Sequence, residues 1–113
     1  MKNLYLSFLH IASSIYPNKN KQDDLDSTAM ELLNKIAVQH SFDKPLTVTE
    51  AMALTEIASP ATIHRKLNGL LDADLIELVF KEKNRRTKYI HPTKSSFVYF
   101  EKMADAMVMV CRN

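Results

Sequence analysis

Residues 59–75 read SPATIHRKLNGLLDADL, and this stretch decides the fold because it marks both the start and the inner face of a helix. Ser59 is of a type that caps helix N-termini, and Pro60 suits the first helical position, where its missing N–H costs nothing. Apolar residues then recur at i, i+4, i+7 and i+8, which predicts one apolar stripe made by Ile63, Leu67, Leu70 and Leu71.

The other faces of this helix are polar or small. With about 100° of turn per residue, the face opposite the stripe contains Ala61, Thr62, Arg65, Gly69 and Asp72, with His64 and Asn68 on one flank and Lys66 on the other. Such faces are normally solvated, so the neighbouring elements decide whether this one binds a partner.

The preceding residues predict two helices. From a cap at Asp26 or Ser27, apolar residues at helical spacing run to Ala37, and Pro45 prevents continuation of this helix. Thr47 and Glu50 match a capping box that opens a short third helix. Only about four residues, 55–58, separate it from the 59–75 helix, which predicts a helix-turn-helix.

After Leu75 the apolar period changes from 3.6 to 2. Ile76, Leu78 and Phe80 predict a strand with one buried face, residues 82–86 a polar tip, and residues 87–91 the return strand. Six basic residues and one acid lie between positions 81 and 94, and this local excess is typical of a polyanion contact. A basic hairpin directly after a helix-turn-helix is interpreted as a wing.

The two ends of the chain are predicted to be apolar helices. Residues 3–16 carry two adjacent apolar rows, and a helix from a cap at Thr93 toward Cys111 carries another apolar face. A stripe this wide favours burial against a second subunit as well as the chain's own core, although an ordinary core helix is the competing interpretation. The predicted dimer-interface residues are Leu4, Phe8, Ile11, Ile15, Phe100, Met103 and Met107.

Composition and motifs do not favour catalysis. The 113 residues contain one glycine, which argues against Gly-rich phosphate loops, and one cysteine, which suits a reducing cytoplasm. The four histidines have no metal-ligand spacing, and no nucleophile motif appears. No apolar run approaches the ~20 residues of a membrane span. We therefore expect no enzyme, no metal, no cofactor, no membrane partner and no signal peptide.

DNA binding has a physical basis at each part. Arg on a major-groove helix can pair with a guanine edge, the positive N-terminal end of the helix suits a phosphate, and wing arginines can reach the minor groove or phosphates. The candidate DNA-binding residues are Ser59, Ala61, Thr62, His64, Arg65, Lys66, Asn68, Lys83, Arg85, Arg86 and Lys88.

Residues 25–93 also resemble the MarR family of bacterial transcription regulators. The similarity is carried by SPATIHRKL, which resembles the family's recognition helix, and by NRRTKYIHPT from Asn84 to Thr93, which resembles its wing. The resemblance implies a dimer with interlocking terminal helices, DNA contacts from Thr62, His64 and Arg65, and Arg86 as the wing arginine. Asn84 stands where the family's wing has aspartate. Asp74 stands where it has glycine, and aspartate tolerates the left-handed conformation at some cost.

The sequence thus predicts a mainly α single domain, residues 1–113, with a small β-hairpin. Residues 25–92 form a winged helix-turn-helix, and residues 1–17 and 93–113 are the dimerisation helices. The predicted function is a cytoplasmic, homodimeric regulator of transcription that binds specific double-stranded DNA, and a small-molecule effector is left open. The alternatives are a winged-helix module for protein interaction or assembly, and a phage or plasmid replication or partition factor that binds DNA.

Overall fold

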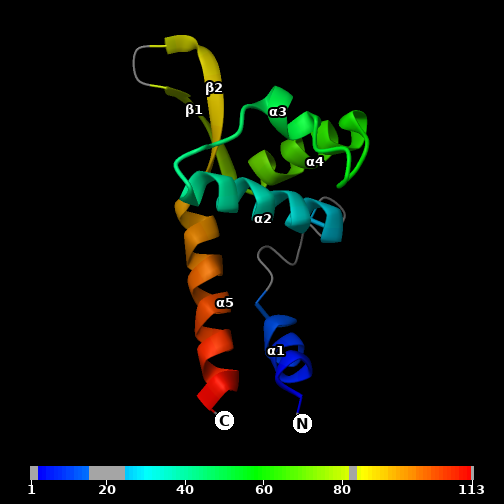
Figure 1. The fold of residues 1–113 in the computed structure, drawn as a ribbon, viewed down its shortest axis with the longest axis vertical. Helices are drawn as coiled ribbons and strands as arrows, with labels where there is room; N and C mark the ends of the chain where they lie inside the picture. Colours follow the sequence, from blue (N-terminus) through cyan, green and yellow to red (C-terminus); the bar gives the residue numbers. More distant parts are fainter. Residues whose placement is uncertain (1–2, 16–24, 82–83, 113) are drawn as a thin grey trace.

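The computed structural model describes residues 3–15, 25–81 and 84–112, and this part of the chain is mainly helical with a two-stranded antiparallel sheet (Figure 1). This confirms the predicted helix-rich class with a small hairpin. The element order is α1 (Leu4–Ala12), α2 (Ser27–Ser41), α3 (Val48–Met52), α4 (Pro60–Asp72), β1 (Ile76–Lys81), β2 (Asn84–Pro92) and α5 (Lys94–Arg112). The predicted site residue Lys83 lies outside the described residues.

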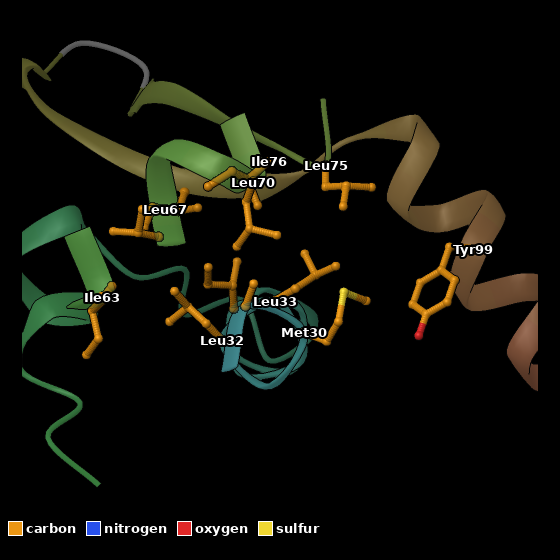
Figure 2. Close-up of a cluster of buried hydrophobic side chains, with 13 residues drawn as sticks. Met30, Leu32, Leu33, Ile63, Leu67, Leu70, Leu75, Ile76 and Tyr99 are labelled. Atoms are coloured by element: carbon orange, nitrogen blue, oxygen red, sulfur yellow. The ribbon is translucent and has the colours of Figure 1, made fainter. Parts of the chain in front are cut away.

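The core is formed where α2 and α4 pack against each other, with β1, β2 and the start of α5 closing it (Figure 2). Ile63, Leu67 and Leu70 of the predicted stripe are almost fully buried, and Leu71 is partly buried against them. The α2 side of this contact is equally apolar and contributes Met30, Leu32, Leu33 and Ile36. The face of α4 opposite this contact is therefore left to solvent.

The helix N-termini are capped where the sequence predicts. Asp26 accepts a hydrogen bond from the Ala29 N–H at 2.9 Å, and Ser59 accepts one from the Thr62 N–H at 3.3 Å. Thr47 and Glu50 form the capping box, with bonds of 3.1 and 2.9 Å to each other's backbone N–H groups. Thr93 likewise accepts from the Ser96 N–H at 3.3 Å, which confirms it as the cap of α5.

The two helices α2 and α4 end in the same way, with an aspartate in the left-handed conformation. Asp43 has φ 61°, and its N–H and that of Lys44 donate to the carbonyls of His40 and Gln39, each at 3.0 Å. This is the Schellman arrangement, which usually places glycine at the left-handed position. α2 ends at Ser41, two residues past the end predicted before His40.

The turn after α4 repeats this arrangement and anchors α5. Asp74 also lies in the left-handed region, with φ 60°, and its N–H and that of Leu75 donate to the carbonyls of Leu71 and Leu70. The helix therefore ends at Asp72, three residues before its predicted end. The Asp74 carbonyl accepts a bond from the Thr93 hydroxyl at 2.6 Å, and the Leu75 carbonyl accepts bonds from the Thr93 N–H and the Ser96 hydroxyl.

The hairpin pairs in the register Leu78 with Ile90 and Val79 with Tyr89, and its irregularity lies between Phe80 and Lys81. β2 begins at Asn84, so Arg85 and Arg86 belong to a strand and not to a five-residue tip as predicted. Ile76 and Ile90 are buried, but Leu78 and Phe80 are 36% and 40% exposed. The prediction of a continuous buried face was wrong, because the core covers only the base of this two-stranded sheet.

The hairpin is also attached to the segment before α3. The Ile90 N–H donates to the Leu46 carbonyl at 2.7 Å, and Thr47 forms an isolated bridge with Tyr89. α3 is a single short helix that ends at Met52, so residues 53–59, more than the predicted four, connect it to α4. The base of the hairpin and the start of α3 are thereby held together.

At the other end of the molecule, α1 and α5 lie side by side and project away from α4 and the hairpin (Figure 1). α1 ends at Ala12, earlier than the predicted helix of residues 3–16. Ala12, Ala106 and Val110 are buried where the two helices meet. We call this pair, Leu4–Ala12 with Lys94–Arg112, the terminal helix pair.

Replacing Asp43 by glycine should stabilise the fold. Glycine adopts a φ of about 60° without the steric cost that a Cβ atom imposes, so we expect Asp43→Gly to raise the free energy of unfolding by about 0.5–1 kcal/mol. Asp43→Ala should lower it, because alanine lacks the short polar side chain that makes aspartate more tolerant of the left-handed region. Urea unfolding followed by circular dichroism measures both. A loss of stability in Asp43→Gly would contradict the interpretation of the turn.

Candidate nucleic-acid interface

The solvent face of α4 carries most of the residues predicted to contact DNA. Ser59, Ala61, His64, Arg65 and Asn68 are exposed. Thr62 is partly buried beside the helix N-terminus. Because α2 and α3 pack against the other side of α4, this face has a fixed orientation on the body of the protein. α4 contains no acidic residue before Asp72, so the exposed face has basic and neutral polar character over most of its length.

At the N-terminus of α4, two hydroxyl groups interact with each other. The Ser59 hydroxyl accepts from the Thr62 N–H and donates to the Thr62 hydroxyl oxygen at 3.0 Å. Thr62 is the acceptor in this pair, so its own hydroxyl proton is not used in the pair. A hydroxyl held in this way at the positive end of a helix is suited to donating to a phosphate or to a base acceptor.

Lys66 does not belong to the exposed face. It is only 6% exposed, and its ammonium group lies 2.8 Å from the carboxylate of Asp26. The expectation that Lys66 contacts DNA is therefore dropped. Gly69, which the helical wheel places outward, is also buried. A sequence signal for Lys66 exists: it lies three residues after Ile63 and four before Leu70, next to the apolar stripe.

The Lys66–Asp26 pair joins α4 to the first turn of α2. The Lys66 ammonium, as a hydrogen-bond donor, is the main cause that lowers the pKa of Asp26, and the Ala29 N–H that Asp26 caps adds to this effect. Asp26 therefore acts twice, as the cap of α2 and as the counter-charge of a buried ammonium. The pair helps to set the position of α4 on the body.

The hairpin presents a second basic surface. Arg85, Arg86 and Lys88 are exposed on β2. The Lys88 ammonium lies 5.2 Å from the centroid of the Phe80 ring, and that of Lys81 lies 5.9 Å from the Tyr89 ring. Aromatic side chains thus lie next to two of the hairpin lysines, an arrangement that residue spacing did not identify.

A groove of about 670 Å³ lies between the hairpin and the turn after α2. Its walls include Val79, Lys81, Tyr89 and His91 from the hairpin and Asp43 and Lys44 from the turn. The groove was not predicted, because it depends on the approach of two segments that are far apart in the sequence.

The residues predicted for a dimer interface fall into three groups. Leu4 and Met107 are 57% and 56% exposed, whereas Phe8 and Ile11 are partly buried. Ile15, Phe100 and Met103 are partly buried against the chain's own core. Other large apolar side chains of the terminal helix pair are about half exposed, namely Tyr5, Leu6, Leu9, Phe97, Val98, Val108 and Met109.

Within residues 3–15, 25–81 and 84–112, no three His, Cys, Asp or Glu side chains come together in a way that could hold a metal ion. No helix in the described part of the chain has the length and apolar character needed to cross a membrane. Neither a scan of protein-family models nor a search of curated proteins finds a match to this chain. The resemblance to the MarR family therefore stays a prediction.

The Lys66–Asp26 pair is tested with Asp26→Asn, which keeps a good N-cap but removes the negative charge. Breaking a buried pair by removing one partner destabilises strongly; since Asp26 is about half exposed, we expect a loss of about 1–2 kcal/mol in the free energy of unfolding at pH 7. Urea unfolding measures this. In Lys66→Met, a side chain of similar volume replaces the ammonium, and stability should change by less than about 1 kcal/mol.

The same pair predicts a pH dependence. The pKa of Asp26 in the folded chain lies below its ordinary value of 3.8, so its contribution to stability is complete above that value and is lost as the pH falls through the lowered pKa. The stability difference between wild type and Asp26→Asn should be constant from pH 7 to 5 and should shrink below about pH 4. A difference that shrinks at neutral pH would contradict this assignment.

Proposed function

We propose that the chain is a homodimeric regulator of transcription that binds specific double-stranded DNA through a winged helix-turn-helix. In this proposal α3 and α4 form the helix-turn-helix, α4 enters the major groove, and the β1–β2 hairpin is the wing. The observation that carries it is the solvent face of α4, which exposes His64, Arg65 and Asn68 and has no carboxylate before Asp72.

The exposed side chains match the chemistry of DNA. Arg can donate two hydrogen bonds to a guanine edge, and Asn can pair with adenine, so Arg65 and Asn68 are suited to reading bases. Arg85, Arg86 and Lys88 on the hairpin are suited to phosphates, which fix the register of the protein on the duplex. In this proposal His64 and the hydroxyl of Thr62 contact the sugar–phosphate backbone beside the groove.

The terminal helix pair supports the homodimer. A monomer rarely exposes a contiguous apolar surface of more than a few hundred Å². Nine large apolar residues on α1 and α5 are 42–65% exposed, and in this proposal a second copy covers part of them; a stable interface takes ~800 Å² from each partner. A two-fold dimer would place two α4 helices about 34 Å apart, on a pseudo-palindromic site.

Duplex binding across a salt series tests the DNA contacts. We expect affinity to fall steeply with salt, and Arg85→Ala to lower the slope of log K against log[salt] by about one, because one phosphate contact is lost. Arg65→Ala should reduce discrimination at one base pair by about 1–3 kcal/mol. The target comes first from selection of bound sites in random DNA, where a palindrome is expected.

Lys102→Ala is the matched control for this experiment. It removes the same charge from an exposed position on α5, which projects away from α4 and the hairpin (Figure 1), and should leave the salt slope unchanged. The absence of salt-dependent binding at micromolar protein would contradict the proposal and favour a winged-helix module for protein contact. If Arg85→Ala and Lys102→Ala lower the salt slope equally, the effect comes from the net charge of the protein and not from a phosphate contact made by the hairpin.

Self-association is tested by Met107→Glu, which places a carboxylate on the apolar surface of α5. A buried carboxylate without a partner is costly, so we expect the dissociation constant of the dimer to rise at least about tenfold. Sedimentation velocity measures it over a concentration series. Asn34→Glu makes the same change of charge at an exposed position on α2 and should have no effect. A monomeric wild type would contradict the dimer.

A further inference from the structure

Three elements meet at a cluster of rings that we call the histidine joint, formed by His40 of α2, His91 of β2 and Phe97 of α5. The ring centroids of His40 and His91 are 4.7 Å apart with an interplanar angle of 66°. The Phe97 ring lies 6.2 Å from that of His40 and 5.9 Å from that of Phe100. The joint therefore lies where the hairpin, the C-terminal end of α2 and the start of α5 meet.

The surroundings of the joint act on the protonation of His91. Burial lowers the pKa of His91, the charge of His40 lowers it further, and Glu77, its cross-strand partner in β1, partly opposes both effects. Lys81 of β1 and Asp43 and Lys44 of the turn line the same groove as His91.

Phe97, which α5 contributes to the joint, carries no charge, so only the two histidines of the joint can bind a proton. Because the pKa of His91 in the folded chain lies below 6.5, the unfolded chain binds this proton first as the pH falls. Acid therefore lowers the stability of this contact.

We propose that the histidine joint is an acid-sensitive hinge: when both rings carry a proton they repel each other, and the base of the hairpin loosens from the body. Two like charges at this separation disfavour each other, and partial burial reduces the screening by water. The bond next to the joint is the one from the Ile90 N–H to the Leu46 carbonyl, which holds β2 to the segment before α3. Loosening is therefore expected at Ile90 first.

NMR on the intact chain tests the joint without DNA. The His91 imidazole signals should shift as the pH falls, and the His91 midpoint should rise in His40→Phe, which keeps a ring but removes the charge. In Glu77→Gln, at an exposed position, the His91 midpoint should fall. An unchanged His91 midpoint in both variants would overturn the proposal.

Amide hydrogen exchange then tests the loosening. The protection factor of the Ile90 amide should fall at least about threefold between pH 7.5 and 5.5 in wild type and stay constant in His40→Phe. Constant protection in wild type, or an equal loss in both proteins, would overturn the hinge. If His40→Phe fails to fold, Glu77→Gln provides the comparison. Because Glu77 raises the pKa of His91, the Ile90 amide of Glu77→Gln should lose protection at a lower pH than that of wild type.

The effect on DNA binding rests on the function proposed above and needs a background without the imidazole of α4. In His64→Asn, affinity for the selected duplex should fall at least about threefold from pH 7.5 to 5.5, and adding His40→Phe should remove this dependence. An identical pH profile with and without His40→Phe would overturn the regulatory role of the joint. Failure of the wild-type chain to bind duplex at any pH would instead overturn the proposed function, while titration and exchange still decide the hinge.

Discussion

The packing of α4 against α2 is the constraint on which the rest of the structure depends. Ile63, Leu67 and Leu70 are buried against the apolar face of α2, and this contact determines which side of α4 meets solvent. An α-helix has one angular position per residue, so burying these three side chains leaves His64 and Arg65 exposed without any further interaction. The candidate interface is thus a consequence of core packing.

Aspartates occupy the start of α2 and the turns that follow α2 and α4, and they play two different roles there. Asp26 caps α2 and neutralises the buried ammonium of Lys66, so an ion pair links the first turn of α2 to α4. Asp43 and Asp74 take the left-handed positions that glycine usually fills, while the single glycine of the chain, Gly69, is buried within α4. The chain therefore uses aspartate where helices must stop.

Local features of the fold were predictable from sequence, whereas long-range ones were not. The caps at Asp26, Thr47 and Ser59 depend on residues three positions away, so the sequence contains all the information that they need. The burial of Lys66 depends on a carboxylate 40 positions earlier in the sequence. Alternation along β1 indicates that Leu78 and Phe80 share a face, but not how far the core extends over it.

The candidate site was predictable to a similar degree. The exposed residues of α4 follow from the apolar stripe, but the groove beside the hairpin and the contact between His40 and His91 require tertiary structure. For the terminal helices, the sequence identifies apolar surface in excess of what one core needs. It does not divide that surface between the core, which takes Phe100 and Met103, and solvent, which Met107 faces.

The turn after α4 links the two ends of the molecule mechanically. The carbonyls of Asp74 and Leu75, immediately after α4, accept hydrogen bonds from Thr93 and Ser96 at the start of α5. Ser96 is fully buried, and Tyr99 adds an apolar contact to the core one turn later. A rotation of α5 would therefore act directly on the end of α4. If two copies associate through the terminal helix pair as proposed, the packing of α5 sets the spacing of the two α4 helices, and with it the spacing of the DNA half-sites.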